Sequence, residues 1–253
     1  MELTEPIAIE GDERERVYAH VEARGAVEKD DAREALYPPD PPGEPQHSRE
    51  FRHNVAILKR DGYLEEDEDG TLRIALDVDE AGEAFTAADV EVTIRPARQE
   101  DLSGIVGAMR QVVEEMTYIE AETIADEIDH EDVLLRHNEL ESRMFFVATV
   151  DEEVVGWAHL HVPTLEKLSH TAELTVGVLE EYRGMGIGSQ LLDRAMVWVR
   201  SNGLEKIYQS VPSTNEDALE FFESRGWGVE AVREGHYKLD DEYIDEVMMA
   251  IEL

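Results

Sequence analysis

The sequence contains no cysteine among its 253 residues. This absence excludes disulfide bonds, thiolate metal sites and a cysteine nucleophile. No apolar run approaches the ~20 residues that a membrane-spanning helix needs, and the run from Met144 to Val150 is among the longest. The first residues carry neither the basic start nor the apolar segment of a secretion signal. We therefore expect a soluble, cytoplasmic protein with no membrane partner.

Positive charge is scarce as well. The chain has 23 lysines and arginines against 60 aspartates and glutamates, a formal net charge of −37, and only five of its residues are lysine. The acidic residues are spread along the chain, and in molar salt, where the Debye length is about 3 Å, their mutual repulsion is largely screened. We interpret this composition as that of a halophilic protein from a salt-accumulating cytoplasm. An acidic protein that binds basic partners is the alternative.

The length and the apolar fraction of 42% suit two packed domains. A polar, weakly patterned stretch from 77 to 84 separates them, so we predict one domain over 1–88 and another over 89–253. In the first, the patterns predict helices over 16–25, 31–36 and 48–60, with Ser48 as the cap of the third, and then a hairpin that turns at Asp69-Gly70. This order of elements resembles a small winged helix-turn-helix domain.

The second domain alternates strand and helix patterns. Strands are predicted near 90–94, 144–150, 154–162, 172–178, 206–211, 227–232 and 246–251, and helices over 102–116, 121–141, 189–203 and 215–224. The early strands follow one another as a meander, whereas the later ones alternate with helices. The expected fold class is α+β, a mixed central sheet with helices on both faces.

A glycine-rich loop between a strand and a helix is the strongest local signal. It reads Arg183-Gly184-Met185-Gly186-Ile187-Gly188-Ser189. Backbone N–H groups of such a loop can approach an anion closely, and the following helix adds its positive end. The loop lacks the lysine of a P-loop, and Ser189 stands where a dinucleotide fingerprint has its third glycine. The loop therefore predicts a phosphate site of another type.

The stretch from Val176 to Leu192 resembles the acetyl-CoA-binding motif of the GNAT N-acetyltransferases, whose pattern Gln/Arg-x-x-Gly-x-Gly/Ala is matched by Arg183, Gly186 and Gly188. A second block from Asn215 to Trp227 resembles the family's Asn-x-x-Ala…Gly-Phe segment. The resemblance spans 89–253 and implies the acyl-CoA N-acyltransferase fold, with acetyl-CoA as co-substrate. It implies that the cofactor is held by Val176, Gly177, Val178, Arg183, Gly184, Met185, Gly186, Ile187, Gly188, Ser189 and Asn215.

The candidates for proton transfer follow from the same resemblance. Family members often use a glutamate on the strand before the loop as general base, and Glu173 is the only charged residue within 172–178. The family's usual acid, a tyrosine seven residues after the asparagine, is replaced here by Phe222. Either another group such as Tyr208 or Tyr237 would then serve, or the thiolate would leave unassisted, or catalysis would be impaired. We expect no metal, and the histidine pair His159 and His161 on one strand is commonly structural.

Two functions remain open at this point. The first is an enzyme that transfers an acetyl group from acetyl-CoA to a primary amine of a small molecule or a protein, with a homodimer allowed. The second is a regulator that binds DNA through the basic stretch 47–60, with the acyltransferase fold as a CoA sensor. Residues 1–88 hold 10 basic and 24 acidic residues, hence a net charge of −14, and such a background repels phosphate. The sequence therefore favours the enzyme.

Overall fold

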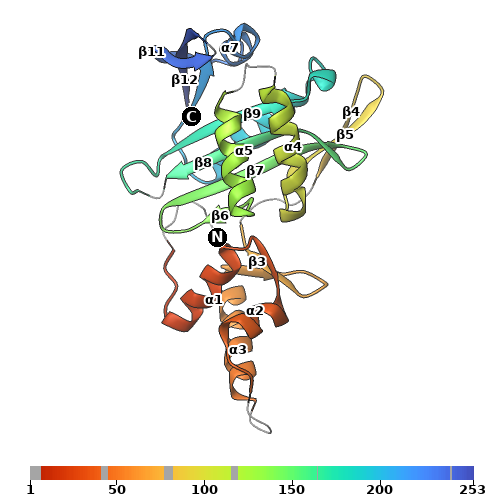
Figure 1. Cartoon of the computed structure of the whole chain (residues 1–253), viewed down its shortest axis with the longest axis vertical. Coiled ribbons are helices and arrows are strands. Elements are labelled where there is room, and N and C mark those ends of the chain that lie inside the picture. Colours follow the sequence, from red (N-terminus) through yellow and green to blue (C-terminus); the bar gives the residue numbers. More distant parts are fainter. Residues whose placement is uncertain (1–6, 41–44, 77–81, 115–118, 164, 240) are drawn as a thin grey trace.

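The computed structural model describes residues 7–40, 45–76, 82–114, 119–163, 165–239 and 241–253. They form an N-terminal unit, residues 7–76, and a larger C-terminal unit, residues 82–253 (Figure 1). No helix in these ranges is long and apolar enough to cross a lipid bilayer.

The N-terminal unit packs three helices against a small sheet. Its elements are α1 (Asp12–Glu22), β1 (Ala26–Glu28), α2 (Lys29–Leu36), α3 (Gln46–Arg60), β2 (Leu64–Glu66) and β3 (Thr71–Ile74). The three strands pair in the order β1-β3-β2. Val17, Phe51, Val55 and Leu72 are buried in a core of their own, because they recur at helical or alternating spacing.

The predicted cap of α3 was wrong. The helix begins two residues before Ser48, and the Asp40 carboxylate accepts hydrogen bonds from the backbone N–H groups of His47 (2.7 Å) and Ser48 (3.1 Å). An acceptor from outside the helix thus satisfies donors of the first turn that lack a partner within it. Such a distant cap has no local sequence signature.

The C-terminal unit is built on one large sheet. Its elements are β4 (Glu83–Ala87), β5 (Val90–Pro96), a 3₁₀ turn (Gln99–Asp101), α4 (Leu102–Val113), α5 (Ile119–Glu131), β6 (Arg136–His137), β7 (Glu141–Val150), β8 (Glu153–Pro163), β9 (Thr171–Val178), a second 3₁₀ turn (Glu180–Tyr182), α6 (Ile187–Ser201), β10 (Lys206–Pro212), α7 (Glu216–Glu223), β11 (Gly228–Leu239) and β12 (Glu242–Glu252). The strand order is β11-β12-β10-β9-β8-β7-β5-β4, and β6 pairs with β7. The pair β9–β10 is parallel and the other pairs are antiparallel, which confirms the predicted mixed α+β sheet.

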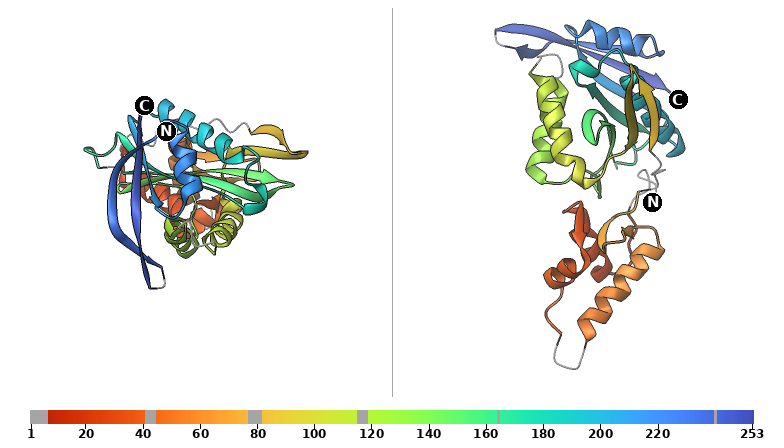
Figure 2. Two further views of the ribbon diagram at one scale, coloured as in Figure 1. Left: turned by 90° about the horizontal axis from the view of Figure 1, so that it is seen from above. Right: turned by 90° about the vertical axis from the view of Figure 1, so that its right-hand side faces the viewer.

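Helices cover both faces of this sheet, as predicted. Helices α4 and α5 lie on one face and α6 on the other (Figure 2). The apolar stripe of α6, Leu191, Leu192, Ala195, Trp198 and Val199, is buried in the core. Packing of this stripe, rather than helix propensity alone, stabilises α6.

Three predicted boundaries differ in the structure. The helix expected over 121–141 ends at Glu131, because Asp132 has a left-handed φ of 56° and the chain then pairs as β6. The strands expected near 227–232 and 246–251 form one long hairpin, β11–β12. The domain boundary expected after residue 88 falls in the turn between the paired strands β4 and β5, so the large sheet starts at Glu83. Residues 77–81 of the expected linker lie outside the described residues.

Ionic and polar contacts join the two units. The Tyr18 hydroxyl of α1 donates to the carbonyl oxygen of His137 at 2.9 Å. Glu22, also in α1, lies 3.3 Å from the guanidinium of Arg136 and accepts a hydrogen bond from the Asn138 amide at 3.1 Å. Arg136 pairs in turn with Glu131 of α5 at 2.8 Å. The N-terminal unit therefore contacts the segment that connects α5 to β7.

Candidate active site

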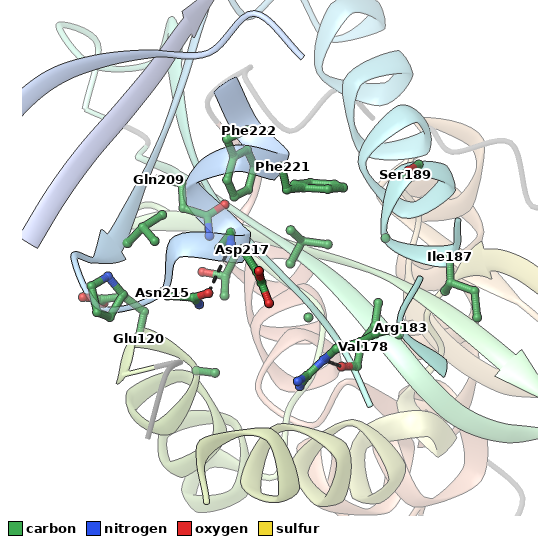
Figure 3. Close-up of a pocket in the computed structure, with 18 of the residues that line it drawn as sticks. Glu120, Val178, Arg183, Ile187, Ser189, Gln209, Asn215, Asp217, Phe221 and Phe222 are labelled. Atoms are coloured by element: carbon green, nitrogen blue, oxygen red, sulfur yellow. Dashed lines mark hydrogen bonds between the residues drawn. The ribbon is translucent and has the colours of Figure 1, made fainter. Parts of the chain in front are cut away.

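Strands β9 and β10 part in the middle of the large sheet. They pair only over Thr171–Glu173 and Lys206–Tyr208, and Glu173 opposite Tyr208 is the last pair. Beyond it lies a cavity of about 470 Å³ between the two strands, the glycine loop, α7 and the start of α5. Its wall includes residues 175–178 of β9 and 209–212 of β10 (Figure 3). A break in strand pairing thus opens a slot through a sheet that is otherwise filled by side chains.

The glycine loop forms one side of this cavity. Gly184 (φ 72°) and Gly186 (φ 83°) have left-handed backbones that side chains rarely adopt, and a Cβ at either position would meet nothing within 4 Å. Glycine is therefore needed here for the turn and for open space beside the backbone. Helix α6 starts at Ile187, so its free N–H groups and positive end face the same loop. These features fit a diphosphate.

Arg183 and Gly177 hold the strand end that leads into the loop. The Arg183 Nε donates to the carbonyl oxygen of Val178 at 2.9 Å, and the two residues lie together at one side of the cavity (Figure 3). A Cβ on Gly177 would lie 2.3 Å from the Trp157 ring. The glycine in β9 is thus also required by core packing, a reason that the motif alone does not reveal.

Helix α7 forms the opposite wall with two aromatic rings, Phe221 and Phe222 (Figure 3). The Arg225 guanidinium stacks 3.8 Å from the centre of the Phe221 ring and donates to the Ser189 hydroxyl. Phe222 is buried against Trp227, so it closes the cavity with an apolar surface. The Asn215 side chain caps α7 by accepting from the Ala218 N–H at 3.1 Å, while the residue also lines the cavity.

Acidic side chains gather at the end of the cavity near α5. Glu120 lines the cavity and accepts a hydrogen bond from the Tyr237 hydroxyl at 2.9 Å. Glu246 is 2% exposed and lies 2.8 Å from the Arg233 guanidinium. Burial, together with the charge of Glu120, raises the pKa of Glu173. A group that is partly desolvated and surrounded by like charges is a good proton acceptor near neutral pH.

The two tyrosines named as acid candidates are both hard to ionise. Burial and then the Glu173 charge raise the pKa of Tyr208. Burial and then Glu120 raise the pKa of Tyr237. Both phenols therefore keep their protons at neutral pH, as a general acid must before it donates.

Every residue predicted to hold the cofactor, Met185 excepted, lines the cavity. Glu173, Tyr208 and Tyr237 lie beside its described lining rather than in it: Glu173 is two residues before the lining residue Thr175 on the same face of β9. The sequence analysis missed Glu120, Glu246 and Arg225. Only Glu246 has a local signal, as an acid that begins the apolar run of β12.

Comparison with known proteins agrees with this geometry. Residues 109–227 match the model of the acetyltransferase (GNAT) family. An N-alpha-acetyltransferase of Sulfurisphaera tokodaii is 36% identical over 121 residues, 43% of this chain and 69% of that protein. One of Saccharolobus solfataricus is 33% identical over 104 residues, 37% of this chain and 61% of that protein. The chain belongs to the GNAT acetyltransferase family.

Solved structures share its fold. A GCN5-related N-acetyltransferase from Kribbella flavida covers 64% of this chain and 98% of its own, with a TM-score of 0.55 and 22% identity. A putative acetyltransferase from Salmonella typhimurium, solved with its cofactor acetyl-CoA, covers 64% of this chain and 93% of its own, with a TM-score of 0.52 and 19% identity. The protein is an enzyme that transfers an acetyl group from acetyl-CoA to an amine.

Proposed function

We propose that this enzyme acetylates the terminal α-amino group of peptides or proteins. The observation that carries the proposal is the slot between β9 and β10, with an anion-binding loop at one end and the carboxylates of Glu120, Glu173 and Glu246 near the other. Carboxylates attract an ammonium group and, once it is bound, can accept its proton. Two relatives named N-alpha-acetyltransferase support the α-amino group over other amines.

In this proposal the diphosphate of acetyl-CoA lies on the loop from Gly184 to Ser189, and its pantetheine arm follows the backbone of residues 176–178. Acetyl-CoA supplies the activated thioester. Glu173 takes the proton from the acceptor's ammonium group, directly or through one water, so that the neutral amine can attack. Tyr208 is the first candidate for protonating the leaving thiolate, because it is opposite Glu173 in the last pair before the cavity, whereas the hydroxyl of Tyr237 donates to Glu120.

The test is a comparison of two acceptors of equal charge. One peptide carries a free N-terminus and no lysine, and the other carries a blocked N-terminus and one lysine. With acetyl-CoA in excess, we expect thiol release with the first peptide and at least tenfold less with the second, an energy difference of about 1.4 kcal/mol. Acetylation of the lysine peptide alone would refute the α-amino assignment while leaving the acetyltransferase activity intact.

We propose further that the N-terminal unit is a winged-helix-like domain that does not bind DNA. The element order α1-β1-α2-α3-β2-β3 supports the resemblance. Part of the basic stretch is already neutralised within the unit, because Lys59 pairs with Glu66 and Arg60 with Asp61, both at 2.7 Å. The hairpin after α3 is acidic from Glu65 to Asp69, which disfavours an approach to phosphates. No observation therefore favours the regulator alternative.

A further inference from the structure

Strand pairing aligns four functional side chains across the large sheet. Arg143 of β7 is opposite His161 of β8, His161 is opposite Glu173 of β9, and Glu173 is opposite Tyr208 of β10. We call these four residues the cross-sheet row. Residues directly opposite one another share a face, with Cβ atoms about 4.5–5.5 Å apart in antiparallel pairs. The His161 imidazole therefore stands between the Arg143 guanidinium and the Glu173 carboxylate.

The row lies on the face covered by α5. Arg143 is 2% exposed and donates to Glu127 and Glu131 of α5, both at 2.6 Å, and to the carbonyl oxygen of Val133 at 2.9 Å. Its charge is thus engaged chiefly by α5 and the segment that follows it, and one of its guanidinium nitrogens also lies 4.0 Å from Glu141. The Arg143 end of the row is fixed and closed to solvent.

His161 has a fixed orientation. Its Nδ1 lies 3.4 Å from a carboxylate oxygen of Glu141, which is two residues before Arg143 on the same face of β7. A carboxylate beside Nδ1 keeps the proton of the neutral ring on that nitrogen and leaves Nε2 as the acceptor. The side chain is 33% exposed, so the ring also reaches water.

His159 provides a contrast on the same strand and face. It is 6% exposed, and its ring centre lies 4.6 Å from that of Phe145. Burial lowers the pKa of His159 well below its usual range. His159 is therefore a neutral core residue, as the sequence analysis expected of the pair. His161 does not share this environment.

We propose that His161 is a proton relay that returns Glu173 to its charged form in each catalytic cycle, with Glu141 as the residue that positions it. The N–H bond of the acceptor's ammonium breaks as an O–H bond forms on Glu173. That O–H bond then breaks as an N–H bond forms on His161 Nε2, directly or through one water, and the imidazolium gives the proton to solvent. The net change is one proton moved from amine to water. The inference rests on the proposed role of Glu173, and both residues act through it rather than on the substrate.

Electrostatics fit the direction of this transfer. The hydrogen bond with Glu141 raises the pKa of His161, and the charges of Glu173 and Glu127 add to the rise. Burial raises the pKa of Glu173, assisted by Glu120 and Glu246 and opposed by His161 and Arg233. The rise in the pKa of His161 favours the transfer and the rise in the pKa of Glu173 opposes it; the proton moves toward His161 because an imidazole is ordinarily a stronger base than a carboxylate. The relay requires neutral His161, so turnover falls as the pH drops through the pKa of His161.

The test is the pH profile of His161→Gln, with His170→Gln as the control. His170 is an exposed histidine in the turn before β9. We expect kcat of His161→Gln to fall about tenfold, less than the 10²- to 10⁴-fold typical of a direct acid or base, and the acidic limb of kcat to lose one titrating group. His170→Gln should keep the wild-type kcat and the full acidic limb. All variants should bind acetyl-CoA like the wild type. Added imidazole should partly restore His161→Ala, because the site is open to water.

A second variant, Glu141→Gln, tests the relay independently in case His161→Gln does not fold. Glu141→Gln removes the carboxylate that orients the ring and raises the pKa of His161, so the acidic limb should move to lower pH, and kcat at its plateau should fall to a value between those of the wild type and His161→Gln. An unchanged limb in Glu141→Gln, or full kcat with an unchanged limb in His161→Gln, would overturn the relay. If the relay is overturned in this way but Glu173→Gln still loses activity, the proposed function is retained and only the role of His161 is rejected. A wild-type enzyme that acetylates no peptide would refute that function instead.

Discussion

Glu173 and Tyr208 are the last paired residues of β9 and β10, and the cavity opens directly beyond them. The proposed proton acceptor and the proposed proton donor thus lie together where the sheet splits. The backbone at both positions is fixed, because β9 and β10 pair on their outer edges with β8 and β12. The position of the proposed chemistry is therefore set by strand pairing rather than by a loop.

Glu173→Gln should lower kcat by roughly 10²- to 10⁴-fold without changing acetyl-CoA affinity. Because the pKa of Glu173 is raised in the fold, its charged form costs stability at neutral pH, and the loss grows as pH rises past the unfolded value. The glutamine variant should therefore melt slightly higher than the wild type at pH 8 and equally at low pH. Scanning calorimetry at both pH values measures the difference in melting temperature between the variant and the wild type. A lower melting temperature at pH 8 would argue against a desolvated carboxylate.

Gly186→Ala should weaken acetyl-CoA binding by about tenfold or more, since a methyl group beside the loop displaces charge-assisted backbone hydrogen bonds. The matched control is Gly203→Ala. Gly203 also has a positive φ (72°) with nothing within 4 Å of its Cβ position, but it lies at the far end of α6. Both variants should lose about 1–2 kcal/mol of unfolding free energy from left-handed strain. Titration calorimetry with acetyl-CoA should show weaker binding only for Gly186→Ala. Equal affinities of the two variants would contradict the assignment of the diphosphate to this loop.

Tyr208→Phe should lower kcat about tenfold or more at unchanged acceptor KM if this phenol protonates the leaving thiolate. Tyr237→Phe should instead change the acceptor KM, because it frees Glu120 from the hydrogen bond at 2.9 Å. Steady-state kinetics with varied acceptor distinguishes the two. If neither variant loses kcat, the thiolate leaves without assistance, and the apolar Phe222 wall needs no substitute for the missing tyrosine.

Arg143→Leu should destabilise the C-terminal unit by about 3–5 kcal/mol, because it leaves the Glu127 and Glu131 carboxylates without their buried partner. Arg110→Leu is the control, since Arg110 is 53% exposed in its pairs with Asp126 and Asp129 and exposed pairs contribute about 0–1 kcal/mol. Urea unfolding followed by tryptophan fluorescence gives both values. Equal losses would mean that the buried pair contributes no more than a surface one.

The melting temperature should rise steeply with salt if the net charge of −37 reflects a halophilic protein. Raising KCl from 0.1 to 3 M shortens the Debye length from about 10 Å to below 3 Å and screens the repulsion among surface carboxylates. An equal concentration of a neutral osmolyte is the control for effects other than screening. A melting temperature that is flat with KCl would favour the alternative of an acidic protein that binds basic partners.

Local patterns were enough to predict most elements and the cofactor loop. The glycines at 184 and 186, the apolar stripe of α6 and the turn at Asp151-Glu152, where both residues have positive φ, are features of contiguous residues. Their physical causes, backbone sterics and helical periodicity, act within a few positions. For this reason the family resemblance could be recognised in the sequence alone.

The arrangement of the acidic site was decided only by the tertiary structure. Glu120, Glu173 and Glu246 come from α5, β9 and β12, and no spacing along the chain relates them. In a chain with 60 acidic residues, a functional carboxylate looks the same as a solvated one until folding buries it. The cap of α3 by Asp40 and the pairing of Arg143, His161 and Glu173 depend likewise on contacts between distant segments, because burial and register are properties of the assembled sheet.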